Sequence, residues 1–517
     1  MRTTTVLPVL PAPVVRTPVR ASPQARLLLA GVGLGGAVDL LFYRQALGVS
    51  LLVFVGLVLG TLFGLSRVED VRPAWRNLWL LGPLVFFAGM VAVRANAFLT
   101  ALNVLATLAL LGLLAYFYAA SRVTRLDLIG YPLALLAVLG NAFLQPAPLL
   151  PATVTVAREH RRGVGPLLPV LRGLALALPV LLLFSCLLAS ADVVFARYLG
   201  AVLQFDFLPD FGDLFAQGLI VTGAGWFLAG ALVYALRRRP GAGEGFPWEP
   251  ETAALRGMAS LGFVEVVTIL SAVNLLFLAF GAIQFAYLFG GRANITLAGF
   301  SYADYARRGF FELVAVSVLT LGLILGLQWL VRPRTPAQTW LFNGLSTLMI
   351  GLVLVLLASA LQRMVLYEEA YGYTHLRLYV HVFMLWLAAT FLWLLGTLWV
   401  WPRRFAIGAF VCALGFLATL NVVNPDVTIA RENLGRYQAA GRLDALYLTD
   451  LSDDAVPLLM ASLDTLQGED RALLRARLLG LARREPTPGT QTWPAFHLAR
   501  QTAATVLAQN RARLEQP

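Results

Sequence analysis

Residues 340–362 read WLFNGLSTLMIGLVLVLLASALQ and contain no charged side chain. A helix needs about 20 predominantly apolar residues to cross the hydrocarbon core of a bilayer, so this stretch predicts a membrane-spanning helix. The rest of the chain has the same character, because 59% of its 517 residues are hydrophobic and only 13% are charged. An ordinary soluble domain has about 25% charged residues. The composition therefore excludes a soluble globular protein.

Ten further apolar runs resemble residues 340–362 in length. Together they predict spans near 27–43, 47–65, 78–93, 97–119, 173–190, 214–236, 257–289, 309–331, 340–362, 378–401 and 405–423. A twelfth candidate, 128–150, is interrupted or ended by Pro132, Pro146 and Pro148, which favour a break in a helix. The predicted fold class is all-α, a polytopic transmembrane helical bundle of about 11 spans, or 12 if residues 128–150 also cross.

The arginines predict the orientation of the bundle. The chain has no lysine, and 29 of its 40 arginines precede residue 424. If 128–150 does not cross and the amino terminus is cytoplasmic, the cytoplasmic loops hold 21 of these arginines and the outer loops hold 8. If 128–150 does cross, the division becomes 15 to 14. Since basic residues collect in cytoplasmic loops, we expect eleven spans, a cytoplasmic amino terminus and an external carboxyl-terminal segment.

The two ends of the chain differ from the apolar middle. Residues 1–26 contain five prolines and four arginines, which predict a disordered cytoplasmic leader before a transmembrane domain at 27–423. Residues 424–517 carry 11 arginines and 11 acidic residues, with leucines at helical spacing in stretches such as EDRALLRARLLGLARR at 469–484. This pattern predicts a small extramembrane helical domain at 424–517.

The sequence predicts no metal site, cofactor or nucleic-acid partner. Cys186 and Cys412 lie in apolar runs, and the four histidines are scattered along the chain. The net charge of +12 comes entirely from residues 1–423, which carry 29 arginines against 17 acidic residues beside the predicted spans, so the lipid bilayer is the expected partner. No P-loop, dinucleotide fingerprint, zinc motif or nucleophile elbow is present, which weighs against an enzyme.

Three carboxylates, Asp39, Glu265 and Glu312, fall within or near the predicted spans, where a charge is costly unless it pairs, protonates or meets water. Glu312 follows Arg308 by four residues, so a salt bridge at the membrane edge accounts for it. Glu265 has no arginine within one helical turn and is a candidate to line a wet cavity with Asn274 and Gln284. The spacing of these three residues does not keep them on one helical face.

Four polar segments, at 190–199, 300–313, 363–381 and 424–437, all lie on the outer face in the eleven-span arrangement. Among their charged residues and histidines are Asp192, Arg197, Asp304, Arg307, Arg308, Arg363, Glu368, Glu369, His375, Arg377, Asp426 and Arg431. We expect a shared external site in which arginines bind an anionic lipid or an envelope ligand. The alternative is an aromatic belt with surface ion pairs that anchor the helix ends.

Several stretches of this outer face resemble a known family. They are LLLFSCLLASADVVFARYL, YADYARRGFFELVAV, LQRMVLYEEAYGYTHLRLYVHVFMLWLA and NPDVTIARENLGRY, with the following LDALYLTDLSDDAVPLL. Over roughly residues 170–460 the chain resembles a bacterial family of multi-pass membrane proteins that is catalogued only as a domain of unknown function. The resemblance implies a bacterial integral membrane protein, expected in the cytoplasmic membrane, and it implies no activity.

Three classes of function remain open from the sequence. An envelope-associated scaffold or sensor would use the external carboxyl-terminal domain to bind a protein partner, and we favour this class. A transporter would use the intramembrane Glu265, although we find no internal repeat of the spans. A membrane-embedded transferase acting on a lipid-linked or envelope substrate would use outer acidic and arginine residues such as Asp304 and Arg377.

Overall fold

The computed structural model describes residues 23–119, 122–147, 211–237, 261–289, 310–331, 334–401, 404–484 and 492–515. Within these residues the chain forms helices, and one isolated β-bridge joins Leu261 to Val331. The all-α prediction is therefore confirmed for the described part of the chain. The span expected at 173–190 and almost all of the leader expected at 1–26 lie outside the described residues.

Among the described residues, nine helices are long and apolar enough to cross a membrane. They are α1 (Pro23–Phe42), α2 (Val49–Val68), α4 (Ala97–Phe117), α9 (Phe211–Arg237), α11 (Phe263–Phe289), α14 (Phe310–Leu330), α15 (Pro336–Tyr371), α16 (His375–Trp399) and α17 (Phe405–Val423). The protein is thus an integral membrane protein with a polytopic helical bundle. The predicted total of eleven spans is not confirmed.

The span expected at 78–93 differs most from its prediction. It begins as a 3-10 helix, η1 (Trp75–Leu80), and continues as α3 (Leu81–Met90), whose ten residues rise only about 15 Å. Hydrogen bonds nevertheless place this segment along α4. Ala74 N–H donates to Tyr118 O at 2.7 Å at one end, and the Thr100 hydroxyl donates to Arg94 O at 3.1 Å at the other. The segment therefore runs beside the whole of α4.

Residues 128–150, the uncertain twelfth candidate, contain α5 (Gly130–Leu144). This helix has 15 residues and rises about 22 Å, less than the hydrocarbon thickness of about 30 Å. Pro132 lies in the first turn of α5, where a missing N–H costs no intrahelical hydrogen bond.

The chain divides into two compact units, and the boundaries fall within helices. The first unit comprises residues 1–36 and 142–233. In it, α1 approaches α9 through glycines, because a Cβ at Gly31 would lie 2.6 Å from Gly225 O. The indole of Trp226 in α9 donates to Phe143 O at 2.8 Å. These helices pack backbone to backbone, as small residues allow in membranes.

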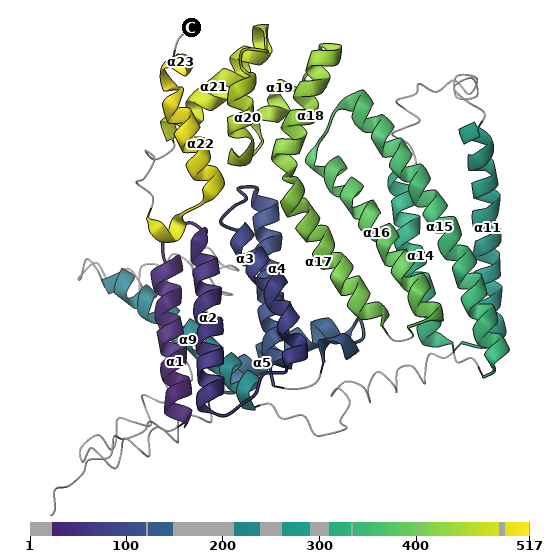
Figure 1. Ribbon diagram of the computed structural model, residues 1–517, viewed down its shortest axis with the longest axis horizontal. Coiled ribbons are helices and arrows are strands. Elements are labelled where there is room, and N and C mark those ends of the chain that lie inside the picture. The colour runs from purple at the N-terminus through teal and green to yellow at the C-terminus, as the bar shows by residue number, and fades with distance from the viewer. Residues whose placement is uncertain are drawn as a thin grey trace, which may run out of the picture. The chain divides into compact units, whose positions relative to one another are not determined.

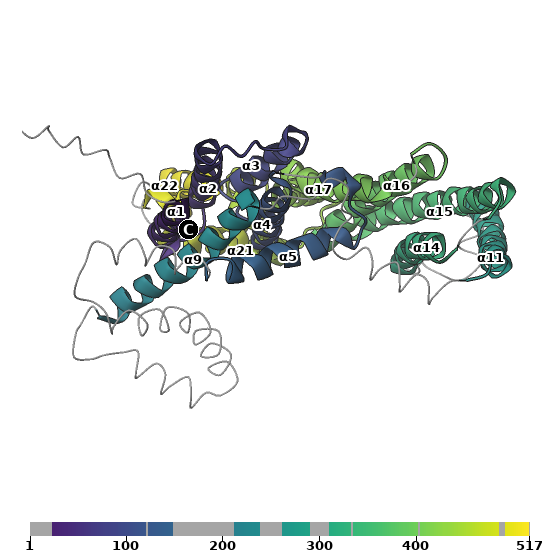
Figure 2. The ribbon, with the colours of Figure 1, turned by 90° about the horizontal axis from the view of Figure 1, so that it is seen from below.

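The second unit comprises residues 37–141 and 234–517 and contains three apolar cores. The first core joins α2, α3, α4, α5 and α17, and the second joins α11, α14 and α15. Figure 2 shows α11 and α14 together beside α15. Helix α16 contributes to all three cores, through Val382 to the first, Phe391 to the second and Leu378 to the third.

The third core belongs mostly to the carboxyl-terminal helices. These are α18 (Pro425–Ala440), α19 (Ala445–Thr449), η3 (Asp453–Ala455), α20 (Val456–Ser462), α21 (Gly468–Arg484), η4 (Trp493–Ala495), α22 (Leu498–Gln509) and α23 (Arg511–Glu515). Figure 1 shows them gathered beyond the end of α17. Buried leucines such as Leu448, Leu459 and Leu474 fill the space between them. We refer to residues 424–517 as the tail.

The spans of the second unit have two distinct ends. The connections 43–48, 91–96 and 372–374 all meet the tail, since Val49 N–H donates to Phe496 O at 2.9 Å and Leu498 N–H donates to Ala92 O at 2.7 Å. At the other end lie the connections 69–74 and 400–404 and the first residues of α11 and α15. We call these the tail end and the arginine end.

Candidate functional site

A tight turn at Asn424 places the first tail helix, α18, directly against the tail end of the spans. Asn424 links α17 to α18 with a φ of 53°, a left-handed conformation that asparagine tolerates better than most residues. Its N–H donates to Leu420 O, and its carbonyl accepts from Thr428 N–H. Pro425 then occupies the first position of α18, where its fixed φ suits a helix start. The next residue, Asp426, consequently faces back toward the spans.

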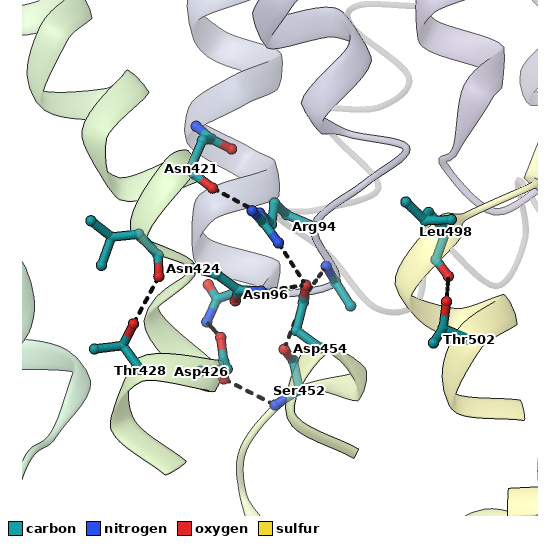
Figure 3. Close-up of polar contacts among 12 residues, drawn as sticks. Arg94, Asn96, Asn421, Asn424, Asp426, Thr428, Ser452, Asp454, Leu498 and Thr502 are labelled. Carbon is teal, nitrogen blue, oxygen red and sulfur yellow. Dashed lines mark hydrogen bonds and ion pairs between the residues drawn. The ribbon is translucent and has the colours of Figure 1, made fainter. Parts of the chain in front are cut away.

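Asp426 lies at the centre of a polar network although its side chain is only 1% exposed. Its Oδ2 accepts from Asn96 Nδ2 at 2.8 Å (Figure 3), and its Oδ1 accepts from Ser452 N–H at 3.0 Å. The same Oδ1 lies 3.1 Å from His375 Nε2. Burial alone would raise the pKa of Asp426, but the hydrogen bonds from His375, Ser452 and Asn96 outweigh it and lower the pKa below its usual value.

His375 connects this carboxylate to Tyr447 in the tail. With its proton on Nε2, the imidazole donates to Asp426, and Nδ1 accepts from the Tyr447 hydroxyl at 2.9 Å. The same hydroxyl oxygen accepts from His375 N–H at 2.8 Å. Burial is the main cause that raises the pKa of Tyr447. The hydroxyl is therefore a hydrogen-bonded neutral group, and the chain Asp426, His375, Tyr447 ties α16 to α19.

A second buried carboxylate, Asp454, fastens the tail to the connection between α3 and α4. Its Oδ2 accepts from Ala95 N–H at 2.6 Å, and its Oδ1 lies 3.4 Å from Arg94 Nη1 and 3.2 Å from Asn424 Nδ2. Figure 3 shows Arg94 between Asp454 and the carbonyl of Asn421, to which its Nε donates at 2.8 Å. Side-chain exposure is 18% for Arg94 and 3% for Asp454, so the pair is largely shielded from water.

Two asparagines extend the network into the membrane. Asn103 of α4 and Asn421 of α17 exchange side-chain hydrogen bonds of 2.8 and 2.7 Å, and both residues are fully buried. Asn421 Nδ2 also donates to Leu417 O. A reciprocal amide pair satisfies donors and acceptors that lipid could not, and it fixes the register of α4 against α17.

The last tail helices attach at the same place. His497 is the N-cap residue of α22, and its Nε2 donates to Arg94 O at 3.1 Å while its Nδ1 accepts from Arg500 N–H. The residue is 1% exposed. Burial first, and then the positive charge of Arg500, lower the pKa of His497. His497 is therefore neutral in the folded tail at neutral pH.

A separate polar group lies where α15 meets α16. Glu368 is 1% exposed, and its Oε2 lies 3.3 Å from His381 Nδ1. The guanidinium of Arg377 stacks over the Tyr367 ring at 4.1 Å and donates to Gly372 O. Burial, followed by the charge of Glu368, raises the pKa of Tyr373 to about 12. The side chain of Asn433 in α18 accepts from Tyr373 N–H and donates to Tyr373 O. It thereby connects the polar residues between α15 and α16 to the tail.

The residues expected at the outer site fall into three sets. His375 and Asp426, from two different polar segments, are in direct contact. Arg363, Glu368 and Arg377 lie near the connection between α15 and α16, whereas Glu369 and Arg431 are exposed. The remaining outer residues, Asp192, Arg197, Asp304, Arg307 and Arg308, lie outside the described residues.

Of the three carboxylates in the predicted spans, Glu265 and Glu312 lie in the first turn of a helix and are exposed, whereas Asp39 lies near the end of α1. Glu265 Oε2 accepts from Gly262 N–H at 2.8 Å, so it stabilises the start of α11 at the arginine end. Asn274 is buried and donates to Leu345 O at 3.0 Å. The side chain of Gln284 and the expected partner of Glu312, Arg308, lie outside the described residues. The described contacts of Glu265 are those of a helix-capping residue.

Sequence reasoning missed six members of the network: Arg94, Asn96, Tyr447, Ser452, Asp454 and His497. Arg94 and Asn96 lie in a connection too short to stand out as a polar segment, and Asp454 is one of eleven acidic residues in the tail. One signal was available for Asn96, because an asparagine directly before an apolar run is a common N-cap. Its Oδ1 indeed accepts from Leu99 N–H at 3.0 Å.

The polar groups of the network bond mainly to one another across the junction of the tail with the spans. Each of its carboxylates is surrounded by donors from the protein, and both imidazole nitrogens of His375 are engaged. Within the described residues, no group of three or more histidines, cysteines, aspartates or glutamates could hold a metal ion. We define the tail latch as Arg94, Asn96, His375, Asp426, Tyr447, Ser452, Asp454 and His497.

Comparison with known proteins gives one positive result. No curated protein and no solved structure matches the chain. The family described as "Domain of unknown function (DUF4153)" matches residues 81–461, which include every member of the tail latch except His497. This match covers most of the chain, in agreement with the resemblance seen in the sequence, and the protein therefore belongs to the DUF4153 family.

Proposed function

We propose that this protein is an envelope-associated scaffold or sensor of the bacterial cytoplasmic membrane, with the tail as its external partner-binding part. One observation carries the proposal: two buried carboxylates, Asp426 and Asp454, join the tail to the ends of the spans. Burying two charges is expensive unless they are paired and fully hydrogen-bonded. Such a junction holds the tail in one orientation on the membrane helices. A scaffold needs this to present a binding surface to its partner, and a sensor needs it to pass a binding signal from the tail to the spans.

The charge distribution supports an external tail. The described arginines of the arginine end include Arg67, Arg72, Arg76, Arg122, Arg125, Arg334 and Arg404, whereas those of the tail end before the tail itself are Arg44, Arg94, Arg363 and Arg377. Two of the latter are engaged within the protein, Arg94 with Asp454 and Arg377 with Tyr367 and Gly372. Basic residues collect on the cytoplasmic side, so the arginine end is inside and the tail is outside.

The two alternative functions receive less support from the described contacts. A transporter would need Glu265 within the membrane, but this side chain caps the first turn of α11. A transferase would need outer carboxylates open to a substrate, whereas Asp426 is enclosed by three protein donors and Glu368 is 1% exposed. The other carboxylates expected for it, Asp192 and Asp304, lie outside the described residues. The scaffold or sensor needs neither feature.

Complementation with tail variants tests the proposal. In a bacterium whose own copy is deleted, we expect the chain to restore envelope integrity, measured as resistance to detergent and osmotic shock. The double variant Asp426→Ala with Asp454→Ala should insert normally and fail to complement. Asp464, an exposed aspartate of the tail, provides the matched control, and Asp464→Ala should complement fully. Full complementation by the double variant, with a demonstrably detached tail, would refute the proposal.

A further inference from the structure

Helices α16 and α17 form an apolar groove of about 510 Å³ near their connection at the arginine end. Its lining is Ala389, Leu392, Trp393, Ile407, Gly408, Val411 and Cys412. All seven residues belong to helices that are apolar enough to span the membrane. The groove therefore opens to lipid chains and not to water.

The groove owes its shape to a pinned tryptophan. The Trp393 ring lies against Gly408, where the absence of a side chain leaves room for the indole. Its Nε1 donates to Arg404 O at 3.1 Å, which fixes the orientation of the ring. Leu392 and Val411 are exposed at 57% and 47% and form the two rims. Because the indole is held by this hydrogen bond, it does not swing out to fill the hollow.

Aromatic and basic residues follow the groove in the connection between α16 and α17. Trp401 stacks on Trp393 with ring centroids 5.5 Å apart. Arg404, the residue before α17, is exposed and forms no ion pair with a carboxylate of the described residues. The sequence has a second arginine at 403 and no acidic residue from 370 to 425. Arg404 precedes the lining residues Ile407 and Gly408 by about one helical turn.

We propose that this groove binds one acyl chain of an anionic glycerophospholipid, whose phosphate is bound by Arg404. A volume of about 510 Å³ is within the range of about 300–1,000 Å³ that is usual for small-molecule sites. Basic pockets between transmembrane helices bind anionic head groups, and an arginine offers a phosphate two parallel N–H donors. The charge of Arg404, which no carboxylate of the described residues pairs, selects an anionic lipid over a zwitterionic one. This assignment does not depend on the proposed function of the tail.

Native mass spectrometry of the purified, delipidated full-length chain tests the assignment. We expect the first molecule of dioleoylphosphatidylglycerol to bind about fivefold more tightly than dioleoylphosphatidylcholine, the effect of one basic residue near an anionic surface. Arg404→Gln should remove this preference. Ala389→Phe, which fills the groove, should weaken binding of both lipids.

Two controls separate the site from general lipid contact. Arg334→Gln removes an exposed arginine from the same end, and Ala413→Phe enlarges an exposed residue of α17 outside the groove. Neither should change the binding of either lipid. Equal affinity of the unaltered chain for both lipids would overturn the assignment, as would unchanged binding in Ala389→Phe. A dimer that Ala389→Phe disrupts without affecting lipid binding would show that a second copy fills the groove.

Discussion

Removal of the Asp454 carboxylate is the sharpest perturbation of the tail latch. Asp454→Ala deletes the acceptor of Ala95 N–H at 2.6 Å and leaves Arg94 and Asn424 without their carboxylate partner. Breaking a buried ion pair costs about 3–5 kcal/mol, and leaving a buried donor unsatisfied costs about 1–3 kcal/mol. Arg94 is 18% exposed and keeps its bond to Asn421 O, so its charge stays partly compensated. We therefore expect a loss of about 3 kcal/mol in the free energy of tail detachment.

Hydrogen exchange measured by mass spectrometry detects this loss locally. A change of about 3 kcal/mol corresponds to roughly hundredfold faster exchange of amides that are protected by tail docking. We expect the increase in α18, α20 and the start of α22, while α4 and α17 stay protected. Asp454→Asn keeps an acceptor for Ala95 N–H and should lose only about 1 kcal/mol.

The matched control is Asp464→Ala in the same tail. The Asp464 side chain is 66% exposed and pairs with Arg471 and Arg513 at the surface. Exposed ion pairs contribute about 0–1 kcal/mol, so exchange should change by less than about fivefold. If Asp454→Ala and Asp464→Ala affected exchange equally, Asp454 would not hold the tail, and the reasoning from burial and hydrogen bonding would be wrong.

Three further predictions concern single features of the fold. The pKa of His497 is lowered in the folded tail, so the unfolded chain takes up a proton near pH 6.5 where the folded chain does not. The free energy of unfolding of the tail should therefore be full above this pH and fall below it. In melting curves recorded between about pH 7.5 and 5.5, the melting temperature of His497→Asn should depend less on pH than that of the unaltered chain. A double-mutant cycle of Asn103→Ala and Asn421→Ala should give a coupling energy of about 1 kcal/mol, and additive losses would contradict the reciprocal amide pair. Gly372 has a φ of 80°, so Gly372→Ala should introduce backbone strain of about 1–2 kcal/mol and lower the melting temperature. Gly435→Ala, in an open position within α18, should raise the melting temperature slightly.

Composition and apolar run length predicted most of the membrane architecture. The runs at 340–362 and 405–423 became α15 and α17, because twenty apolar residues in a membrane have no alternative to a helix. The run at 78–93 was harder, since it begins in the 3-10 helix η1 and its α-helix, α3, has only ten residues. Run length alone does not reveal such a 3-10 start. The side chain of Asn77 fixes η1 through tertiary contacts, since it donates to Phe117 O and accepts from Val123 N–H.

The network at the tail end was predictable only in part. The contact of His375 with Asp426 joins two polar segments that the sequence identified, and the orientation rule put both on one face. Arg94 and Asp454 are 360 residues apart in sequence and meet at 3.4 Å. No local pattern reports such a pairing, because it depends on how the tail folds over the ends of α3 and α4. Residues that act through tertiary contacts need the structure.

Thiol labelling tests the central claim, an external tail fixed on the spans, most directly. In a chain whose two cysteines are replaced by serine, Gln438→Cys places an exposed thiol in α18 and Ala337→Cys places one at the arginine end. A membrane-impermeant maleimide added to intact spheroplasts should label the thiol at 438 and should label the thiol at 337 only after the membrane is opened. Labelling at 337 but not at 438 in intact spheroplasts would place the tail in the cytoplasm and contradict the account.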